Sequence, residues 1–238
     1  MIGSVCGRYS QAKLQTEIAL EWGEVRIELK KPRFNIAPGQ AAPVIRLDDG
    51  ALTVSDEVRW GLIPSWAKDT KIAFRCINAR SETVAEKPAF RSAFKAKRCL
   101  VPGDGFYEWQ PVGKLKQPWR FVRNDGGPLL FAGLWETWTP VGVGTGSETD
   151  GTVPKLETFT VLTTTPNTVT APVHDRMPVI LDGPAAARWL DPKATKEALL
   201  GLCTPADDRL LRRYLVSTVV SNARNDVPQC VEELRDLL

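Results

Sequence analysis

The chain has 238 residues, of which 43% are hydrophobic and 25% charged, and its formal net charge at pH 7 is +3. This is an ordinary globular composition, with enough apolar residues for a sizeable core, and the slight positive charge permits a nucleic-acid surface without arguing for one. No apolar run approaches the ~20 residues of a membrane span, and no secretory signal precedes the first elements, so a cytoplasmic protein without a membrane partner is expected.

The five cysteines are odd in number and form no CxxC pair, which indicates reduced thiols. Four of them, Cys76, Cys99, Cys203 and Cys230, are expected to be small buried hydrophobic residues. The only histidine is His174, so a zinc site built from clustered His and Cys is not expected. The sequence predicts neither a metal nor a cofactor.

In the first third of the chain, Ser10 is placed to cap a helix that carries Leu14, Ile18 and Trp22 and ends at Gly23. Residues 30–40 contain Pro and Gly and predict a loop. Two strands are expected over 42–47 and 52–60, because Asp48-Asp49-Gly50 between them is a hairpin signal.

Further along, short strands alternate with turns and a few short helices. Pro88 limits a helix predicted over 83–94, while Gly183-Pro184 and Pro192 each open a helix. Residues 140–156 are rich in Gly, Thr and Ser and predict a mobile surface insertion. The remaining strands are expected over 99–101, 106–109, 119–123, 129–135, 159–165 and 215–220, and the run 173–181 is expected to lead into another strand. The strands over 119–123 and 129–135 are expected to pair as a hairpin across Asn124-Asp125-Gly126-Gly127.

Many short strands with hairpin turns and a few peripheral helices predict an α+β fold on an antiparallel, barrel-like sheet. The functional-looking segments are scattered from end to end, which favours a single domain over 1–238.

Three reactive side chains stand out: Cys6 near the start, Glu108 between two aromatic residues, and His174 before a strand. An apolar setting would raise the pKa of the Glu108 carboxyl. Each also has a plainer interpretation, because a lone histidine is usually a surface or core residue and a strand Glu usually faces solvent. From the residues alone, a Cys/His/Glu constellation is one hypothesis among these.

Polar residues in turn-rich loops, Asn35, Asn78 and Arg80, either serve turn chemistry or contribute to a site. Trp60 and Trp66 either belong to the core or form a surface on which bases stack. Basic clusters near residues 30–33, 91–98 and 209–213 are either solvated faces or phosphate contacts.

These segments together resemble the SRAP family, the SOS response-associated peptidase-like proteins that crosslink to abasic sites in single-stranded DNA. The resemblance covers most of the chain, in the family order. It rests on Cys6-Gly7-Arg8-Tyr9, Asn35-Ile36-Ala37-Pro38, Arg59-Trp60-Gly61-Leu62-Ile63-Pro64, Asn78-Ala79-Arg80-Ser81-Glu82, Val101-Pro102, Phe106-Tyr107-Glu108-Trp109, Ala132-Gly133-Leu134-Trp135-Glu136 and His174-Asp175-Arg176-Met177-Pro178.

The resemblance implies a mechanism in which the amine of an N-terminal cysteine attacks the aldehyde of a ring-opened abasic site. The resulting Schiff base is closed by the thiol into a five-membered thiazolidine ring. By the resemblance, Glu108 orients the amine of Cys6 and moves its protons, His174 acts as general acid and base at the sugar, and Asn78 helps to hold the sugar.

The resemblance also implies two groups of DNA contacts. The backbone or site contacts are Arg8, Asn35, Arg80 and Arg176, and the wedge against stacked bases is Pro38, Trp66 and Ile77. The expected partner is single-stranded DNA that contains abasic sites, with little sequence preference. A monomer, associated with the nucleoid when bound to DNA, is expected.

One departure from the family concerns the start of the chain. The family's cysteine normally follows the initiator methionine, whereas here Met1 to Val5 precede Cys6, so the Cys6 nitrogen as written is an amide. The true start codon is read as Val5, or the extra residues are foreign to the protein, or Cys6 removes them by attacking the carbonyl of Val5. Two other functions therefore stay open beside crosslinking: a cysteine autopeptidase acting on its own leader, and a non-catalytic single-strand binder.

Overall fold

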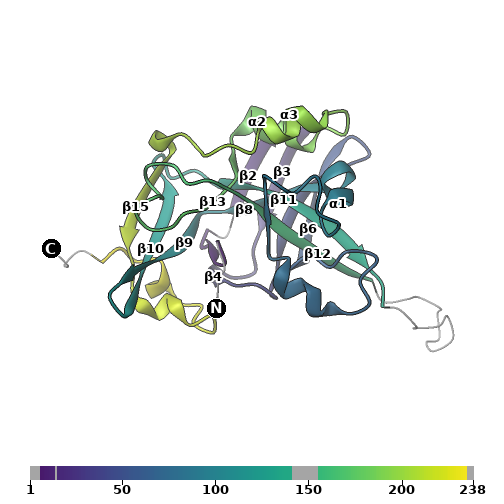
Figure 1. Ribbon diagram of the computed structural model, residues 1–238. Helices are drawn as coiled ribbons and strands as arrows, with labels where there is room; N and C mark the ends of the chain where they lie inside the picture. Colours follow the sequence, from purple (N-terminus) through teal and green to yellow (C-terminus); the bar gives the residue numbers. More distant parts are fainter. Residues whose placement is uncertain (1–5, 14, 141–154, 235–238) are drawn as a thin grey trace.

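Five strands close on themselves into a barrel in the computed structural model, which describes residues 6–13, 15–140 and 155–234 (Figure 1). Around the barrel, β12 pairs with β6, β6 with β5, β5 with β8, β8 with β11, and β11 again with β12. These strands are β5 (Ala41–Asp48), β6 (Ala51–Trp60), β8 (Arg98–Gly103), β11 (Leu129–Trp138) and β12 (Leu156–Thr164).

Strands β8 and β11 of the barrel are covered on both faces, because their successive side chains enter two different apolar clusters. Leu100 and Ala132 pack in one cluster, whereas Val101 and Phe131 pack in the other. Since side chains of a strand alternate between faces, every residue of β8 is buried. This double cover explains why the strands read as continuous apolar runs rather than as alternating patterns.

A second sheet of five antiparallel strands lies against the barrel and contains the first strand of the chain. Its order is β15 (Leu211–Leu215), β10 (Leu115–Arg123), β9 (Gly105–Val112), β1 (Tyr9–Gln11) and β4 (Arg33–Ile36). The short β1 lies between β9 and β4, with Tyr9 opposite Phe106 and also opposite Ile36. This pairing brings residues from the beginning and the middle of the chain side by side.

The remaining elements sit at the margins of the two sheets. Strands β2 (Gln15–Leu20) and β3 (Gly23–Glu28) form a separate hairpin, and β7 (Asn78–Arg80), β13 (Met177–Pro178) and β14 (Ile180–Leu181) pair with barrel strands. The α-helices are α1 (Arg91–Ala96), α2 (Gly183–Leu190) and α3 (Lys196–Gly201). Single 3₁₀ turns are η1 (Thr70–Arg75), η2 (Asp208–Leu210), η3 (Thr218–Ser221) and η4 (Pro228–Cys230).

Helix α2 shows how a peripheral helix is fixed to the barrel. The Asp182 side chain caps it by accepting a hydrogen bond from Ala185 N, and Pro184 occupies its first turn. Its buried face carries Trp189, whose Nε1 donates to Cys99 O at 3.0 Å. Figure 1 shows α2 and α3 side by side along one edge of the molecule.

The expected α+β fold on a barrel-like sheet is confirmed, with one difference in the sheet. The barrel is not wholly antiparallel, because β12 runs parallel to β6 and to β7. Hairpin signals predict antiparallel neighbours only, and these two pairings join strands that are far apart in the sequence.

The helix predicted over residues 10–23 is wrong. This segment contains β1 and β2, and β3 starts at its end, where Gly23 adopts a φ of +125° in the turn. The apolar side chains of the hairpin alternate, since Ile18, Val25 and Ile27 are buried between exposed neighbours. Ser10 is buried in β1, where its hydroxyl donates to Asp104 instead of capping a helix.

Other boundaries also differ from prediction. The helix expected over 83–94 is confined to α1, and the loop over 30–40 contains β4. The strand expected over 215–220 is wrong, because β15 ends at Leu215 and the Ser217 side chain accepts from Val219 N to begin η3. The helix expected at Pro192 starts later, at Lys196, after a cap by Thr195. Residues 141–154 of the expected insertion lie outside the described residues.

Close packing inside the barrel leaves no room for a side chain at Gly133 of β11, and this can be tested. A Cβ at this position would lie 2.8 Å from the Cys99 sulfur and 2.9 Å from a methyl carbon of Val101. Gly133→Ala is therefore expected to lower the free energy of unfolding by about 1–3 kcal/mol in denaturant titrations. The matched control is Gly201, where an added Cβ would have no neighbouring atom within 4 Å. Gly201→Ala should therefore leave the free energy of unfolding unchanged or raise it slightly. Equal stability of the two variants would contradict this packing.

Among the described residues, no helix combines the length and the apolar character needed to cross a membrane.

Candidate active site

A buried pair, Cys6 and Glu108, lies where β1 meets β9. Only 4% of Cys6 and 2% of Glu108 are exposed, and Cys6 N donates a hydrogen bond to Glu108 Oε1 at 2.6 Å. The register of β1 and β9 produces this contact, because Tyr9 stands opposite Phe106 and the antiparallel chains continue past each other. Glu108 therefore faces inward, and the interpretation of a solvent-facing strand residue is wrong.

Burial controls the protonation of both groups. It raises the pKa of the Glu108 carboxyl to about 8, although the hydrogen bonds from Cys6 oppose the shift. Burial also raises the pKa of the Cys6 thiol well above its ordinary value, and the neighbouring Glu108 adds to this. At neutral pH the pair is therefore mainly a carboxylic acid and a thiol.

The backbone of Cys6 adopts an uncommon conformation. Its φ is +46°, in the left-handed region that side chains other than Gly, Asn and Asp seldom adopt. Such conformations persist only where surrounding contacts hold them, and they cluster at functional sites. The hydrogen bond to Glu108 is one such contact.

His174 has two possible partners for Nδ1, which correspond to its two charge states. Nδ1 accepts a hydrogen bond from Arg176 N at 3.1 Å and also lies 3.0 Å from Asp175 Oδ1. Burial lowers the pKa of His174, while the Asp175 carboxylate opposes the shift. In the neutral ring that carries its proton on Nε2, Nδ1 can accept the hydrogen bond from Arg176 N. In the protonated ring, Nδ1 carries a proton and can donate it in a hydrogen bond to Asp175.

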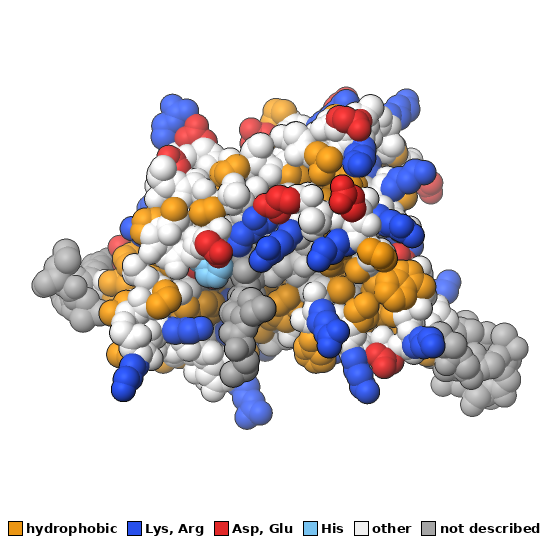
Figure 2. Space-filling view, in the orientation of Figure 1, with side chains coloured by type: hydrophobic (Ala, Val, Ile, Leu, Met, Phe, Trp, Pro, Cys, Tyr) orange, Lys and Arg blue, Asp and Glu red, His pale blue; other side chains and the backbone are white. Residues whose placement is uncertain are grey.

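Glu108 and His174 line one pocket of about 540 Å³. The other residues that line it are Gly7, Arg8, Trp109, Pro111, Lys116, Val173, Asp175 and Ser221. Figure 2 shows the face with the pale-blue histidine, which lies beside an acidic side chain and close to several Lys and Arg side chains. A carboxylic acid and a neutral imidazole thus line one polar opening, and the buried Cys6 contacts the acid from the protein side. This arrangement suits proton transfer coupled to nucleophilic attack.

Arg8 is held in this pocket by Asn35. Arg8 Nη1 donates to Asn35 Oδ1 at 2.7 Å and to Val220 O at 2.8 Å, and its guanidinium lies 5.4 Å from the Trp109 ring. Asn35 is itself buried, and its Nδ2 donates to the carbonyls of Val220, Asn222 and Asn225. The amide therefore connects Arg8 to the segment 220–225.

Arg176 and Asn78 also form hydrogen bonds within the protein. Arg176 is buried, forms an ion pair with the exposed Glu82 and donates to Thr163 O at 2.7 Å. Its charge favours the thiolate of Cys6, so it lies near the buried pair. Asn78, half-buried on β7, donates to Val161 O at 3.4 Å.

The other predicted contacts lie outside the pocket lining. Trp66 is 58% exposed and Arg80 is exposed, while Pro38 and Ile77 are half-buried. Trp60, by contrast, is a core residue whose Nε1 donates to Ile77 O, so the stacking interpretation does not hold for it. Among the described residues, no group of three or more His, Cys, Asp or Glu side chains is arranged to hold a metal ion.

Residues 5–223 match the protein family described as SOS response associated peptidase (SRAP). The chain belongs to the SRAP family.

Two named proteins and one solved structure are similar to this SRAP chain over most of its length. Abasic site processing protein YoqW of Bacillus subtilis (strain 168) is 41% identical over 204 residues, which are 84% of this chain and 86% of that protein. Abasic site processing protein HMCES of Xenopus tropicalis is 35% identical over 241 residues, covering 88% of this chain and 68% of that protein. A crystal structure of a protein from Bacteroides thetaiotaomicron superposes with a TM-score of 0.73 at 28% identity, over 84% of each chain.

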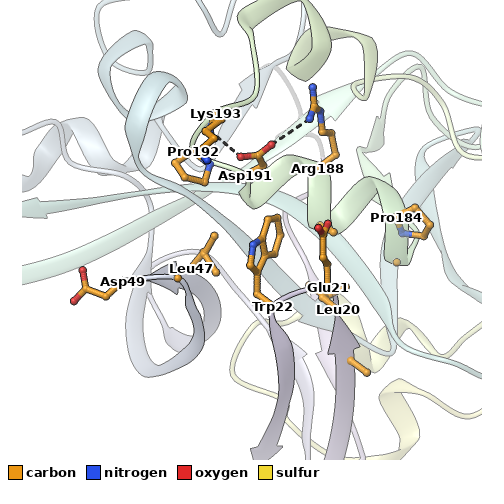
Figure 3. A pocket seen from close by; sticks show the side chains of 14 residues that line it. Leu20, Glu21, Trp22, Leu47, Asp49, Pro184, Arg188, Asp191, Pro192 and Lys193 are labelled. Carbon is orange, nitrogen blue, oxygen red and sulfur yellow. Dashed lines mark hydrogen bonds and ion pairs between the residues drawn. The ribbon is translucent and has the colours of Figure 1, made fainter.

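A larger pocket of this SRAP protein, about 1060 Å³, lies elsewhere, between the turn of the β2–β3 hairpin, the β5–β6 turn and helix α2 (Figure 3). In this pocket Asp191 forms an ion pair with Arg188, and its side chain also accepts a hydrogen bond from the backbone nitrogen of Lys193. No thiol or imidazole lines it. Size alone would select this pocket, but the titratable groups with shifted pKa values are in the smaller one.

Seven residues that line the SRAP pocket were not predicted as site residues from the sequence: Gly7, Trp109, Pro111, Lys116, Val173, Asp175 and Ser221. Asp175 had a usable signal, since it follows His174 directly. Lys116 and Ser221 carried none, because a lysine in a hairpin and a serine in a polar segment are most often plain surface residues.

Proposed function

We propose that this protein processes abasic sites in single-stranded DNA by forming a covalent bond through Cys6. The observation that carries the proposal is the buried contact of 2.6 Å between Cys6 N and Glu108 Oε1, beside a pocket that also contains His174. Membership of the SRAP family and the names of its relatives support the choice of substrate.

The proposed reaction requires Cys6 as the first residue, so that its nitrogen is an amine. The amine attacks C1′ of the ring-opened sugar, and water leaves to give a Schiff base. The thiol sulfur then adds to the same carbon, and the thiol proton ends on the nitrogen, which closes a thiazolidine. The second step is intramolecular, so the positioning of the thiol supplies much of its rate.

Glu108 makes the amine nucleophilic in this proposal. Burial disfavours both an ammonium and a carboxylate, so transfer of one proton from the ammonium to the carboxylate yields a neutral amine and a neutral carboxylic acid. The free amine would otherwise titrate at about pH 7.7–8.0. The carboxylic acid can afterwards return the proton to the oxygen that leaves as water.

His174 is proposed to act on the sugar. The protonated ring, whose Nδ1 faces the Asp175 carboxylate, can donate its Nε2 proton to the ring oxygen as the sugar opens, and the neutral ring that results can take the proton back in the reverse step. Asn78 is proposed to hold the sugar.

For the DNA strand, Arg8 and Arg80 are the proposed backbone contacts, and the exposed Trp66 with Pro38 and Ile77 is the proposed wedge. Asn35 and Arg176 would have to leave their protein partners to bind phosphate, so we propose that both act by shaping the site.

The test is incubation of protein, verified by mass to begin at Cys6, with a single-stranded oligonucleotide containing one abasic site. A slow-migrating species that survives denaturation is expected. The same oligonucleotide with a tetrahydrofuran analogue, which cannot open to an aldehyde, should give none. Salt-dependent binding of both strands without a covalent product would contradict the proposal and favour the non-catalytic binder.

A second candidate function is removal of residues 1–5 by Cys6 itself. It is favoured by the left-handed backbone at Cys6 and by Glu108, which faces the nitrogen that would leave. Sulfur attack on the Val5 carbonyl would form a thioester and release the Cys6 amine, and water would then hydrolyse the thioester. This step would prepare the crosslinking form, and the intact mass of the purified chain reports it.

A further inference from the structure

A rim of four residues borders the pocket on the side of the β9–β10 hairpin. We call Arg8, Trp109, Pro111 and Lys116 the hairpin rim; all four line the pocket. Pro111 stands opposite Lys116 in the hairpin and Trp109 opposite Pro118, so Trp109, Pro111 and Lys116 share one face. Arg8 lies against the Trp109 ring and continues the same rim.

Lys116 is the available cation of this rim. Its side chain is exposed, and no ion pair among the described residues involves it. Arg8, by contrast, already donates to Asn35 and Val220. Lys116 also lies close enough to His174 for its charge to lower the pKa of the ring.

The hairpin is tied to the segment before His174, which fixes Lys116 relative to the ring. Gln110 Nε2 donates to Pro172 O at 3.0 Å, and Gln110 Oε1 accepts from Trp119 Nε1 at the same distance. On its other edge, β9 pairs with β1 only near Gly105 and Phe106. Past that point Tyr107 N donates to Arg8 O at 3.0 Å, and the described residues add no further strand to this edge.

An abasic residue within a strand has a phosphate on each side of its sugar. Because the hairpin rim lines the same pocket as Glu108 and His174, a phosphate next to a sugar held by these two residues can reach Lys116. We propose that Lys116 binds the phosphate that flanks the reacting sugar, and so aligns the abasic residue with Cys6. This inference rests on the proposed function. It adds Lys116, which lies in the β9–β10 hairpin, as a residue that determines specificity.

The proposal predicts more than weaker binding. A phosphate on Lys116 would neutralise a charge that now disfavours the His174 imidazolium, which Asp175 favours and Arg176 disfavours. Binding of the strand would therefore raise the proton affinity of His174 at the moment when a proton donor is needed.

The test is a cycle between protein and DNA variants. Affinity and single-turnover crosslinking are measured for the parent and Lys116→Gln, on abasic oligonucleotides with a neutral methylphosphonate at one or the other flanking position. On the all-phosphate strand, Lys116→Gln should bind several-fold more weakly, and the salt dependence of log K should fall by about 0.7. On the strand in which methylphosphonate replaces the phosphate that contacts Lys116, the parent and Lys116→Gln should have the same affinity.

Lys114→Gln is the matched control, because Lys114 is exposed in the turn of the same hairpin and does not line the pocket. It should behave as the parent on every strand. The proposal is overturned if Lys116→Gln binds like the parent, or if its defect is the same on all three strands. If the parent itself forms no crosslink with any abasic strand, the proposed function fails instead.

Discussion

Cys6→Ala is expected to abolish the denaturation-resistant adduct with abasic DNA. A variant that begins at residue 6 with alanine keeps the amine and can still form a Schiff base, but it lacks the sulfur that closes the ring. Its adduct should therefore hydrolyse on denaturation and appear only after reduction with borohydride. Gel mobility with and without the reductant separates the two steps.

Cys203→Ala is the control for the loss of a buried thiol, since Cys203 is also buried but packs in the cluster that contains Trp189, away from the pocket. It should crosslink like the parent. In the full-length chain, Cys6→Ala should also retain residues 1–5 in an intact-mass measurement if Cys6 removes them. A durable adduct formed equally well by Cys6→Ala would refute the role of the thiol.

Glu108→Gln is expected to slow crosslinking by about 10²- to 10⁴-fold, the usual contribution of a positioned acid or base. Glutamine keeps a hydrogen-bonding carbonyl near the Cys6 nitrogen but cannot take its proton. The variant's rate should then rise with pH through the range in which a free amine titrates, at about pH 7.7–8.0, because solvent must deprotonate it. Single-turnover rates from about pH 6 to 9 would reveal this dependence.

Stability distinguishes this effect from misfolding. The pKa of Glu108 rises from 4.5 to about 8 on folding, so between these values the folded protein binds more protons than the unfolded one. The free energy of unfolding of the parent should therefore fall as pH rises from about 4.5 to 8, and Glu108→Gln should lack this contribution. A variant that is slow at pH 8 and yet no less stable than the parent supports a chemical role. A variant as fast as the parent would remove Glu108 from the mechanism.

Local signals predicted the β5–β6 hairpin, because turn chemistry acts over few residues. The hairpin expected between 119–123 and 129–135 is wrong, since β10 pairs with β9 and β15, whereas β11 pairs with β8, β12 and β14. In the β5–β6 turn, Asp49 and Gly50 both have positive φ values, +50° and +80°, as such turns require. The spacing of Leu14, Ile18 and Trp22 failed for the opposite reason. This spacing matched a helix by chance. In the β2–β3 hairpin the buried residues instead alternate along each strand, and Ile18 lies opposite Val25 on the neighbouring strand.

The site could be predicted only in part, because its members are brought together by tertiary pairing. Cys6 and Glu108 are 102 residues apart, and their contact depends on the short pairing of β1 with β9. Periodicity carries no information about such pairing, so the resemblance to the SRAP family supplied what the residues alone left open. The monomeric state and the roles of Asn78, Arg80 and the wedge stay predictions.

The link from Arg8 to the carbonyl of Val220 sets the order in which the protein can mature during synthesis. These residues are 212 positions apart, and Asp226 in addition accepts hydrogen bonds from Phe34 N and Asn35 N. The anchor of Arg8 therefore cannot form until the segment from Val220 to Asp226 has left the ribosome. Cys6 would gain its complete surroundings only after these later segments are made.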